Sequence, residues 1–176
     1  PEPEAAPEPT SWVRKPRRGA EGRSGDVLVV GVGSLMTQLA KCCKPAPPDE
    51  ICGFVTRGKG VSIHRADCTD FAHLRRKSPD RVIEVDWSGR AGDARDGKSA
   101  LYPVDVAIEA LDRQGLLRDI SDVFAREKMN VIGVQTQSVK GVAWMTFTIE
   151  VADARQVARA MSVVGDVNGV RTVRRK

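Results

Sequence analysis

Residues 100–176 constrain the fold most, because their apolar residues change period from one segment to the next. Some segments alternate apolar and polar residues, as half-buried strands do, and two repeat apolar residues every three or four positions, as amphipathic helices do. The segments follow in the order strand, helix, strand, strand, helix, strand, at 102–110, 116–124, 130–138, 142–151, 157–164 and 167–173. This order predicts a ferredoxin-like βαββαβ unit, whose sheet has two helices on one face and a second, open face.

One aromatic residue falls on the predicted open face. Alternation along the segment 142–151 assigns five apolar residues to the buried face and Trp144 to the other face. The segment Lys140–Phe147 also partly matches the signature of RNA-recognition sheets, in which aromatic rings stack on bases. Trp144 is therefore a candidate for stacking on an RNA base or for covering a partner. Because only one aromatic residue is present, a partner surface is favoured over sequence-specific RNA reading.

Three cysteines and one histidine between residues 26 and 87 have the residue types of a closed zinc site. Cys42 and Cys43 are adjacent, and a hairpin can return His64 to them. His64 and Cys68 are four residues apart, so a helical turn puts both on one face. Three thiolates and one imidazole form a tetrahedral structural zinc site with no position left for water. A unit of this length has a marginal core, to which a metal adds folding energy. The alternative is a set of buried thiols beside an unrelated histidine.

The segments around these residues predict a first strand followed by a small αββαβ arrangement. The first strand is expected at 27–30, a helix runs from Leu35 into the paired cysteines, and prolines end it. Glycines 58 and 60 are expected to supply the positive φ of a hairpin turn. The remaining elements are strands at 51–56 and 61–64, a helix at 68–76 and a strand at 81–87. The whole chain is thus predicted to be α+β, with a small zinc-finger-like αββαβ domain followed by a ferredoxin-like βαββαβ domain.

Other candidate sites in the first unit are weaker. Cys52 lies in a predicted strand, where we expect it to pack as a small hydrophobic residue. His73 is expected to be a surface or packing residue. Gly31 and Gly33 follow a strand, but Met36 stands where a dinucleotide-binding loop needs a third small residue, so no nucleotide site is expected.

The chain has a formal net charge of +5, and basic residues gather around the predicted hairpin and the helix after it. Residues 41–81 contain nine basic and five acidic residues. This excess predicts a phosphate-binding face, with a solvated charged surface as the alternative. The candidates for RNA contact are Arg57, Lys59, Arg65, Arg75, Arg76 and Lys77.

The compositions of three further segments indicate two linkers. Residues 1–10 carry four prolines and three glutamates, residues 11–25 are basic, and residues 88–99 contain no apolar side chain larger than alanine. We therefore predict linkers at 1–25 and 88–99, a zinc domain at 26–87 and a second domain at 100–176. No apolar run is long enough to span a bilayer, and the N-terminus lacks the pattern of a secretory signal. We expect a cytoplasmic protein whose cysteines are thiols or metal ligands.

Two motifs resemble the C-terminal regulatory region of RelA/SpoT-type stringent-response enzymes. They are GVGSLMTQLAKCCKP from Gly31 and GFVTRGKGVSIHRADC from Gly53, and the similarity covers about residues 26–176. The resemblance implies that the first unit is a zinc-finger or conserved-cysteine domain and the second an ACT domain, also described as RRM-like. The metal ligands of the family fall onto Cys42, Cys43, His64 and Cys68.

The resemblance also implies a regulatory function. Full-length members make or hydrolyse (p)ppGpp in catalytic domains that lie N-terminal to this region, and neither histidine here is followed by aspartate, as in the hydrolase. We therefore expect a non-catalytic fragment of a GTP pyrophosphokinase. In this family the region docks at the ribosomal A site with uncharged tRNA, contacts rRNA, and relays amino-acid starvation to the catalytic domains of the same chain.

An alternative function is suggested by ACT domains elsewhere, which bind amino acids at the loop after the first strand. Here that loop leads into a helix whose free N–H groups suit a carboxylate, although it can also be an ordinary turn and cap. The chain would then be a small-molecule sensor and oligomerisation module, with an amino-acid effector and a homodimer formed through the ACT domain. The residues nominated by this resemblance are Asp112, Gly115, Leu116, Asn130 and Ile132.

Overall fold

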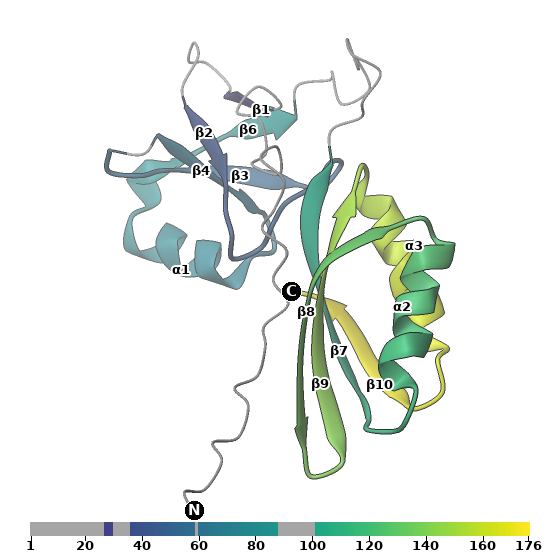
Figure 1. The fold of residues 1–176 in the computed structure, drawn as a ribbon. Helices are drawn as coiled ribbons and strands as arrows, with labels where there is room; N and C mark the ends of the chain where they lie inside the picture. Colours follow the sequence, from purple (N-terminus) through teal and green to yellow (C-terminus); the bar gives the residue numbers. More distant parts are fainter. Residues whose placement is uncertain (1–26, 30–35, 59, 88–100) are drawn as a thin grey trace, which may run out of the picture.

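The computed structural model describes residues 27–29, 36–58, 60–87 and 101–176, which form an N-terminal unit and a C-terminal unit (Figure 1). The N-terminal unit has a two-stranded sheet, β1-β6, and a four-stranded sheet in the order β2-β4-β3-β5. Its elements are β1 (Val27–Val29), β2 (Thr37–Leu39), β3 (Ile51–Val55), β4 (Val61–Arg65), α1 (Thr69–Lys77), the short 3-10 helix η1 (Pro79–Arg81), β5 (Val82–Ile83) and β6 (Val85–Trp87). The predicted linkers at 1–25 and 88–99 lie outside the described residues.

The helix predicted from Leu35 into the paired cysteines is wrong, because this segment contains the strand β2. β2 runs parallel to β4, and its ends are held by hydrogen bonds from Val61 N–H to Met36 O and from Ala40 N–H to Ile63 O, both 2.8 Å. These partners lie more than twenty residues further along the chain. The helical spacing of the apolar residues was therefore overridden by a long-range pairing that periodicity does not reveal.

The hairpin between β3 and β4 confirms the predicted role of its glycines. Gly58 and Gly60 have φ values of +81° and +74°, which side chains rarely tolerate. Gly60 also lies directly against β2, since a Cβ atom there would overlap the carbonyl oxygen of Met36. This glycine is thus required both by the turn and by the approach of the neighbouring strand.

The C-terminal unit confirms the predicted βαββαβ order. Its four antiparallel strands have the order β10-β7-β9-β8, and both helices lie on the same side of the sheet (Figure 1). Its elements are β7 (Tyr102–Leu111), α2 (Leu116–Arg126), β8 (Asn130–Val139), β9 (Val142–Val151), α3 (Ala154–Gly165) and β10 (Val170–Arg175). Among the described residues, no helix is long and apolar enough to cross a membrane.

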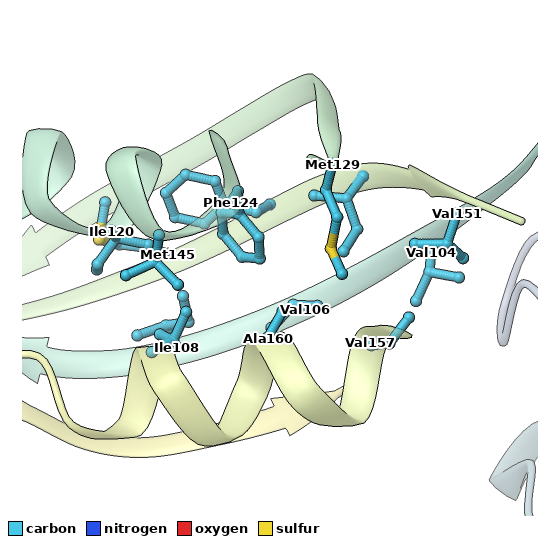
Figure 2. Packing of buried hydrophobic residues seen from close by; sticks show 14 of the residues in the cluster. Val104, Val106, Ile108, Ile120, Phe124, Met129, Met145, Val151, Val157 and Ala160 are labelled. Carbon is cyan, nitrogen blue, oxygen red and sulfur yellow. The ribbon is translucent and has the colours of Figure 1, made fainter. Parts of the chain in front are cut away.

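The core of the C-terminal unit lies between the sheet and the two helices (Figure 2). Along β7 and β9 every second side chain is buried, as the alternation predicted. Phe124 of α2 packs on Phe147 of β9 with ring centroids 5.2 Å apart, and Val157 and Ala160 of α3 complete the layer. The other face of the sheet carries Trp144, which is 52% exposed, so its predicted placement is confirmed.

Candidate metal centre

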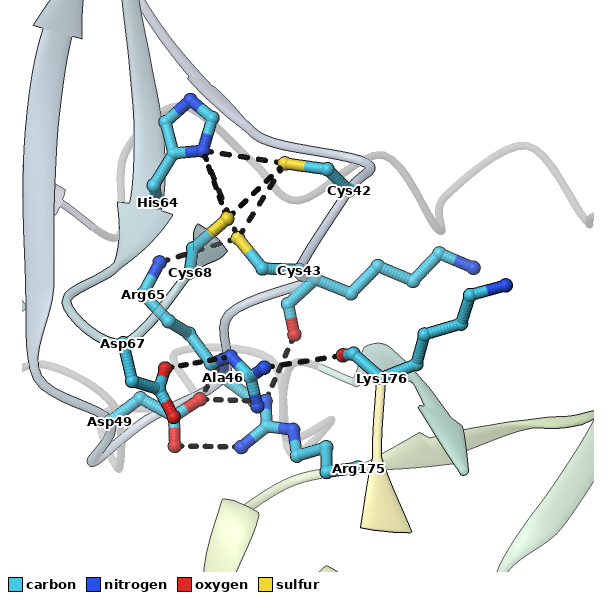
Figure 3. Close-up of polar contacts among 11 residues, drawn as sticks. Cys42, Cys43, Ala46, Asp49, His64, Arg65, Asp67, Cys68, Arg175 and Lys176 are labelled. Atoms are coloured by element: carbon cyan, nitrogen blue, oxygen red, sulfur yellow. Dashed lines mark hydrogen bonds and ion pairs between the residues drawn. The ribbon is translucent and has the colours of Figure 1, made fainter. Parts of the chain in front are cut away.

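Four potential metal ligands from three parts of the N-terminal unit converge on one point (Figure 3). Cys42 and Cys43 lie in the turn after β2, His64 lies on β4, and Cys68 directly precedes α1. The three sulfur atoms and one ring nitrogen all lie within 4.8 Å of one another. The structure thus brings together the four residues that the sequence predicted.

The spacing of these atoms matches a tetrahedral site. The Sγ of Cys42 is 3.9 Å from that of Cys43 and 3.7 Å from that of Cys68, and Nδ1 of His64 lies 3.4 to 3.9 Å from all three. Zinc bound tetrahedrally at 2.3 Å would place sulfur atoms about 3.8 Å apart. The residues present therefore fit a structural zinc ion, and all four positions would be filled by protein.

Burial shifts the pKa values of three of the four converging residues, Cys42, Cys43 and His64. Desolvation, followed by the adjacent thiols, raises the pKa of Cys42, and desolvation raises the pKa of Cys43 to about 11, against the lowering effect of the Arg65 backbone N–H. That N–H donates to the Cys43 sulfur at 3.3 Å. Burial lowers the pKa of His64, although Asp70 opposes the shift. At neutral pH these two thiols hold their protons and the imidazole is neutral, so a metal would bind by displacing protons from sulfur.

Ser62 is a residue of this centre that sequence reasoning missed. Its hydroxyl lies 3.1 Å from Nε2 of His64. A proton on Nε2 that is donated to this oxygen leaves Nδ1, the nitrogen that faces the sulfur atoms, free to bind a metal. The sequence did carry a signal for Ser62, which is its position two residues before His64. Residues two apart on a strand lie on the same face.

The other cysteine and histidine of the N-terminal unit are not among the four converging residues. Cys52 is half-buried on β3 and packs against the cluster of Phe54 and Phe71, in keeping with its predicted packing role. Its burial raises the pKa of the thiol. His73 is exposed on α1.

The predicted RNA-contacting cations occupy different environments. Lys59 lies outside the described residues. Arg65 is 11% exposed at its side chain, pairs with Asp67 at 3.4 Å, and donates to the backbone oxygen of Lys176 at 3.2 Å, so it faces the C-terminal unit. The exposed candidates are Arg57, Arg75, Arg76 and Lys77.

The open face of the C-terminal sheet has a shallow hollow of about 530 Å³ beside Trp144. Amide, hydroxyl and cationic side chains surround the indole ring. The polar and charged residues of its lining are Glu109, Gln135, Gln137, Thr136, Thr146, Thr172, Arg174 and Lys176.

A second hollow, of about 450 Å³, lies at the loop nominated for an amino acid. Asp112, Gly115 and Leu116 line it, but Asn130 and Ile132 do not. The register of the sheet explains the difference. Asn130 pairs with Glu150 at the far end of β9, whereas Thr136 pairs with Met145 and lines the hollow. Thr136 thus stands where the sequence reasoning placed Asn130 and Ile132.

Comparison with known families accounts for both units. Residues 27–88 match the RelA/SpoT RIS domain, and residues 98–175 match the ACT domain. We therefore describe the N-terminal unit as the RIS domain and the C-terminal unit as the ACT domain. The chain belongs to the RelA/SpoT family and corresponds to its C-terminal regulatory region.

Full-length relatives support the same assignment. The chain is 41% identical over 154 residues to the GTP pyrophosphokinase of Escherichia coli. The aligned part covers 86% of this chain and 20% of that protein. It is 40% identical over 161 residues to the bifunctional (p)ppGpp synthase/hydrolase RelA of Mycobacterium tuberculosis, covering 91% of this chain and 21% of that protein. The chain thus spans about a fifth of the length of these curated relatives. The solution structure of the ACT domain from the Chlorobium tepidum GTP pyrophosphokinase is 21% identical over 43% of this chain and 86% of that one, with a TM-score of 0.40.

Proposed function

We propose that this chain is a non-catalytic regulatory part of a (p)ppGpp synthetase, a GTP pyrophosphokinase of the stringent response. Its RIS domain holds one structural zinc ion, and its exposed basic surface contacts the ribosome when an uncharged tRNA signals amino-acid starvation. The signal then passes to catalytic domains N-terminal to this region. The single observation that carries the proposal is the converged Cys42, Cys43, His64 and Cys68 set within a RelA/SpoT RIS domain.

The zinc ion serves as a cross-link in this proposal. It would join the turn after β2 to strand β4 and to the start of α1, which are held together by two small groups of buried residues. Metal analysis of protein purified without added zinc should give about one zinc per chain. A folded chain with little bound metal would contradict the structural site.

The ribosome contact is assigned to the exposed cations of the RIS domain and to the open ACT face around Trp144. Replacing Arg57, Arg75 and Arg76 by glutamate should weaken binding to purified ribosomes that carry uncharged tRNA. The salt dependence should also flatten, by about 0.7 to 0.9 in the log–log slope for each phosphate that the protein no longer neutralises. Arg159→Glu, which changes an exposed arginine on helix α3, is the matched control. Unchanged affinity in the triple variant would remove this surface from the proposal.

The absence of catalysis is tested directly. The isolated chain should form no (p)ppGpp from ATP and GTP, since this proposal assigns the reaction to catalytic domains N-terminal to this region. Measurable synthesis by this chain would overturn its regulatory assignment.

A second candidate function is an amino-acid sensor, which the hollow beside Asp112, Gly115 and Leu116 favours. Arg113 pairs with Asp119 at 2.7 Å, whereas Arg118, which also lines the hollow, has only a longer contact of 3.9 Å with Asp122. Arg118 is therefore the cation better placed for a free carboxylate. Calorimetric titration with the twenty amino acids would test binding. The effect of each amino acid on the fraction of the chain that forms homodimers in solution would test the response. No heat and no thermal shift with any of them would exclude it.

A further inference from the structure

We propose that metal occupancy of the RIS centre controls docking of the ACT domain, through the segment Lys44–Asp49 that directly follows Cys43. We call this segment the docking loop. The inference rests on the proposed zinc site and adds to it a mechanical consequence for the neighbouring domain.

The first residue of the docking loop contacts the ACT domain twice. The ammonium group of Lys44 lies 2.9 and 2.8 Å from the two carboxylate oxygens of Asp105 on β7. The backbone oxygen of Lys44 accepts a hydrogen bond of 2.9 Å from Arg175 on β10. One peptide bond therefore separates the ligand Cys43 from a residue held by two strands of the ACT sheet.

The last residue of the docking loop also binds β10. The carboxylate of Asp49 accepts hydrogen bonds from both terminal nitrogens of Arg175, each 2.7 Å long (Figure 3). The same carboxylate accepts the backbone N–H of Ala46 at 2.8 Å, which holds the loop in shape. The side chains of Arg175 and Asp49 are only 14% and 16% exposed. A paired, forked contact of this kind is sensitive to the geometry of both partners.

The middle of the docking loop enters the ACT domain itself. Ala46 is fully buried and belongs to the core cluster of that domain. Pro47 accepts the backbone N–H of Ala154, at the start of α3, at 2.7 Å. The loop thus replaces solvent at the edge of the ACT core, and its release would expose that edge.

The residue after a second candidate ligand, His64, also contacts the C-terminal end of β10. Arg65 directly follows His64, its backbone N–H donates to the Cys43 sulfur, and its guanidinium donates to the backbone oxygen of Lys176. Figure 3 shows that the side chain of Arg65 extends from the four converging residues towards Lys176, which follows β10. Two of the three chain segments that the metal would join therefore contact the ACT domain one residue after a ligand.

These contacts couple metal binding in the RIS domain to docking of the loop on the ACT domain. A bound metal fixes the turn of Cys42 and Cys43 against β4, so the docking loop starts from a defined position and less conformational entropy is lost when it docks. Without the metal, no shared ion joins the thiols of this turn to His64 on β4. By linkage, docking must strengthen metal binding by the same factor by which the metal strengthens docking.

Amide hydrogen exchange of the whole 176-residue chain tests the first direction. In the structure the amide of Ala154 donates to Pro47 of the docking loop, whereas the amide of Leu111 donates to Gly169 within the ACT domain. Removing zinc with a chelator should accelerate exchange at Ala154 by about tenfold or more, since the loop opens locally, and leave Leu111 unchanged. Equal protection of Ala154 with and without zinc would overturn the coupling.

Zinc affinity tests the reciprocal direction, by competition with a chelator. Arg175→Ala and, independently, Asp49→Asn should each weaken zinc binding about 5- to 20-fold. Arg126→Ala, which removes an exposed arginine in the last turn of α2, should have no effect. Unchanged affinity in both docking variants would refute the coupling and leave the zinc site standing. A wild-type chain that takes up no zinc would refute the zinc site, and this inference with it.

Discussion

The two domains of this chain differ in how they are held together. In the described residues, the ACT domain is built around a single cluster of buried residues that includes Phe124, Phe147, Ile108 and Ile120. The RIS domain has two separate small clusters, and one of them contains the candidate ligands Cys43 and Cys68. The ACT domain therefore depends on its apolar core, and in the RIS domain a bound metal would add a second source of folding energy.

The comparison also separates two kinds of contact. ACT packing follows from local alternation, so most partners of a buried residue are set by the regular sheet and two helices. The RIS centre gathers ligands from residues 42 to 68 through a short parallel strand and a hairpin. Loss of one ligand should therefore have a much greater effect in the RIS domain than loss of one polar group in the ACT domain.

The largest expected effect is the loss of a metal ligand. Cys68→Ser should abolish stoichiometric zinc binding and unfold the RIS domain, since structural zinc provides roughly 10 to 16 kcal/mol of binding free energy. Cys52→Ser, which changes the cysteine outside the centre, should retain the zinc. Metal analysis and the two-dimensional amide NMR spectrum measure both properties. ACT signals that disappear together with the RIS signals would break the proposed difference between the domains.

The next effect concerns the ACT core. Phe147 is fully buried against Phe124, so Phe147→Ala should reduce the free energy of unfolding of the ACT domain by about 3 to 5 kcal/mol. Val134→Ala, at an exposed position of β8, should change it by less than about 0.5 kcal/mol. Urea unfolding followed by ACT amide signals gives the comparison. Zinc content should stay the same in both variants, unless the two domains fold as one unit.

The pH dependence should belong to the RIS domain alone. The raised pKa values of Cys42 and Cys43 keep both thiols protonated in the metal-free site near neutral pH, and the lowered pKa of His64 keeps the imidazole neutral. Zinc must then displace at least two protons, so its affinity should fall by about 100-fold or more for each unit of pH decrease between 8 and 6.5. Competition titrations at several pH values measure the slope. A flat profile would mean that the thiols are not ligands.

The smallest effect distinguishes two glycines of the RIS hairpin. Gly60→Ala places a Cβ against the Met36 carbonyl at positive φ and should cost about 1 to 3 kcal/mol of stability. Gly58→Ala also has positive φ but has open space around the new atom, so only about 1 kcal/mol is expected. Thermal unfolding of the zinc-loaded chains compares them. Equal losses would show that β2 does not constrain the hairpin.

Much of the ACT domain and the four residues of the candidate metal centre could be predicted from the sequence. The alternation along 142–151 assigned Phe147 to the core and Trp144 to the open face, because successive side chains of a strand point to opposite faces. The residue types and spacing of Cys42, Cys43, His64 and Cys68 indicated a closed site. Ser62 was not predicted, since a hydroxyl acquires its role only when the ring of His64 is oriented towards it.

What the sequence alone determined was local: the βαββαβ order, the positive-φ turn at Gly58 and Gly60, and the ligand types. Only the tertiary structure decided that residues 37–39 form a parallel strand and that Thr136 lines the hollow at the loop of Asp112. It also decided that Arg175 binds the carboxylate of Asp49. Periodicity records the environment of a residue within one strand or one helical turn. Pairing between distant segments depends on register and packing across the whole fold, which no local pattern specifies.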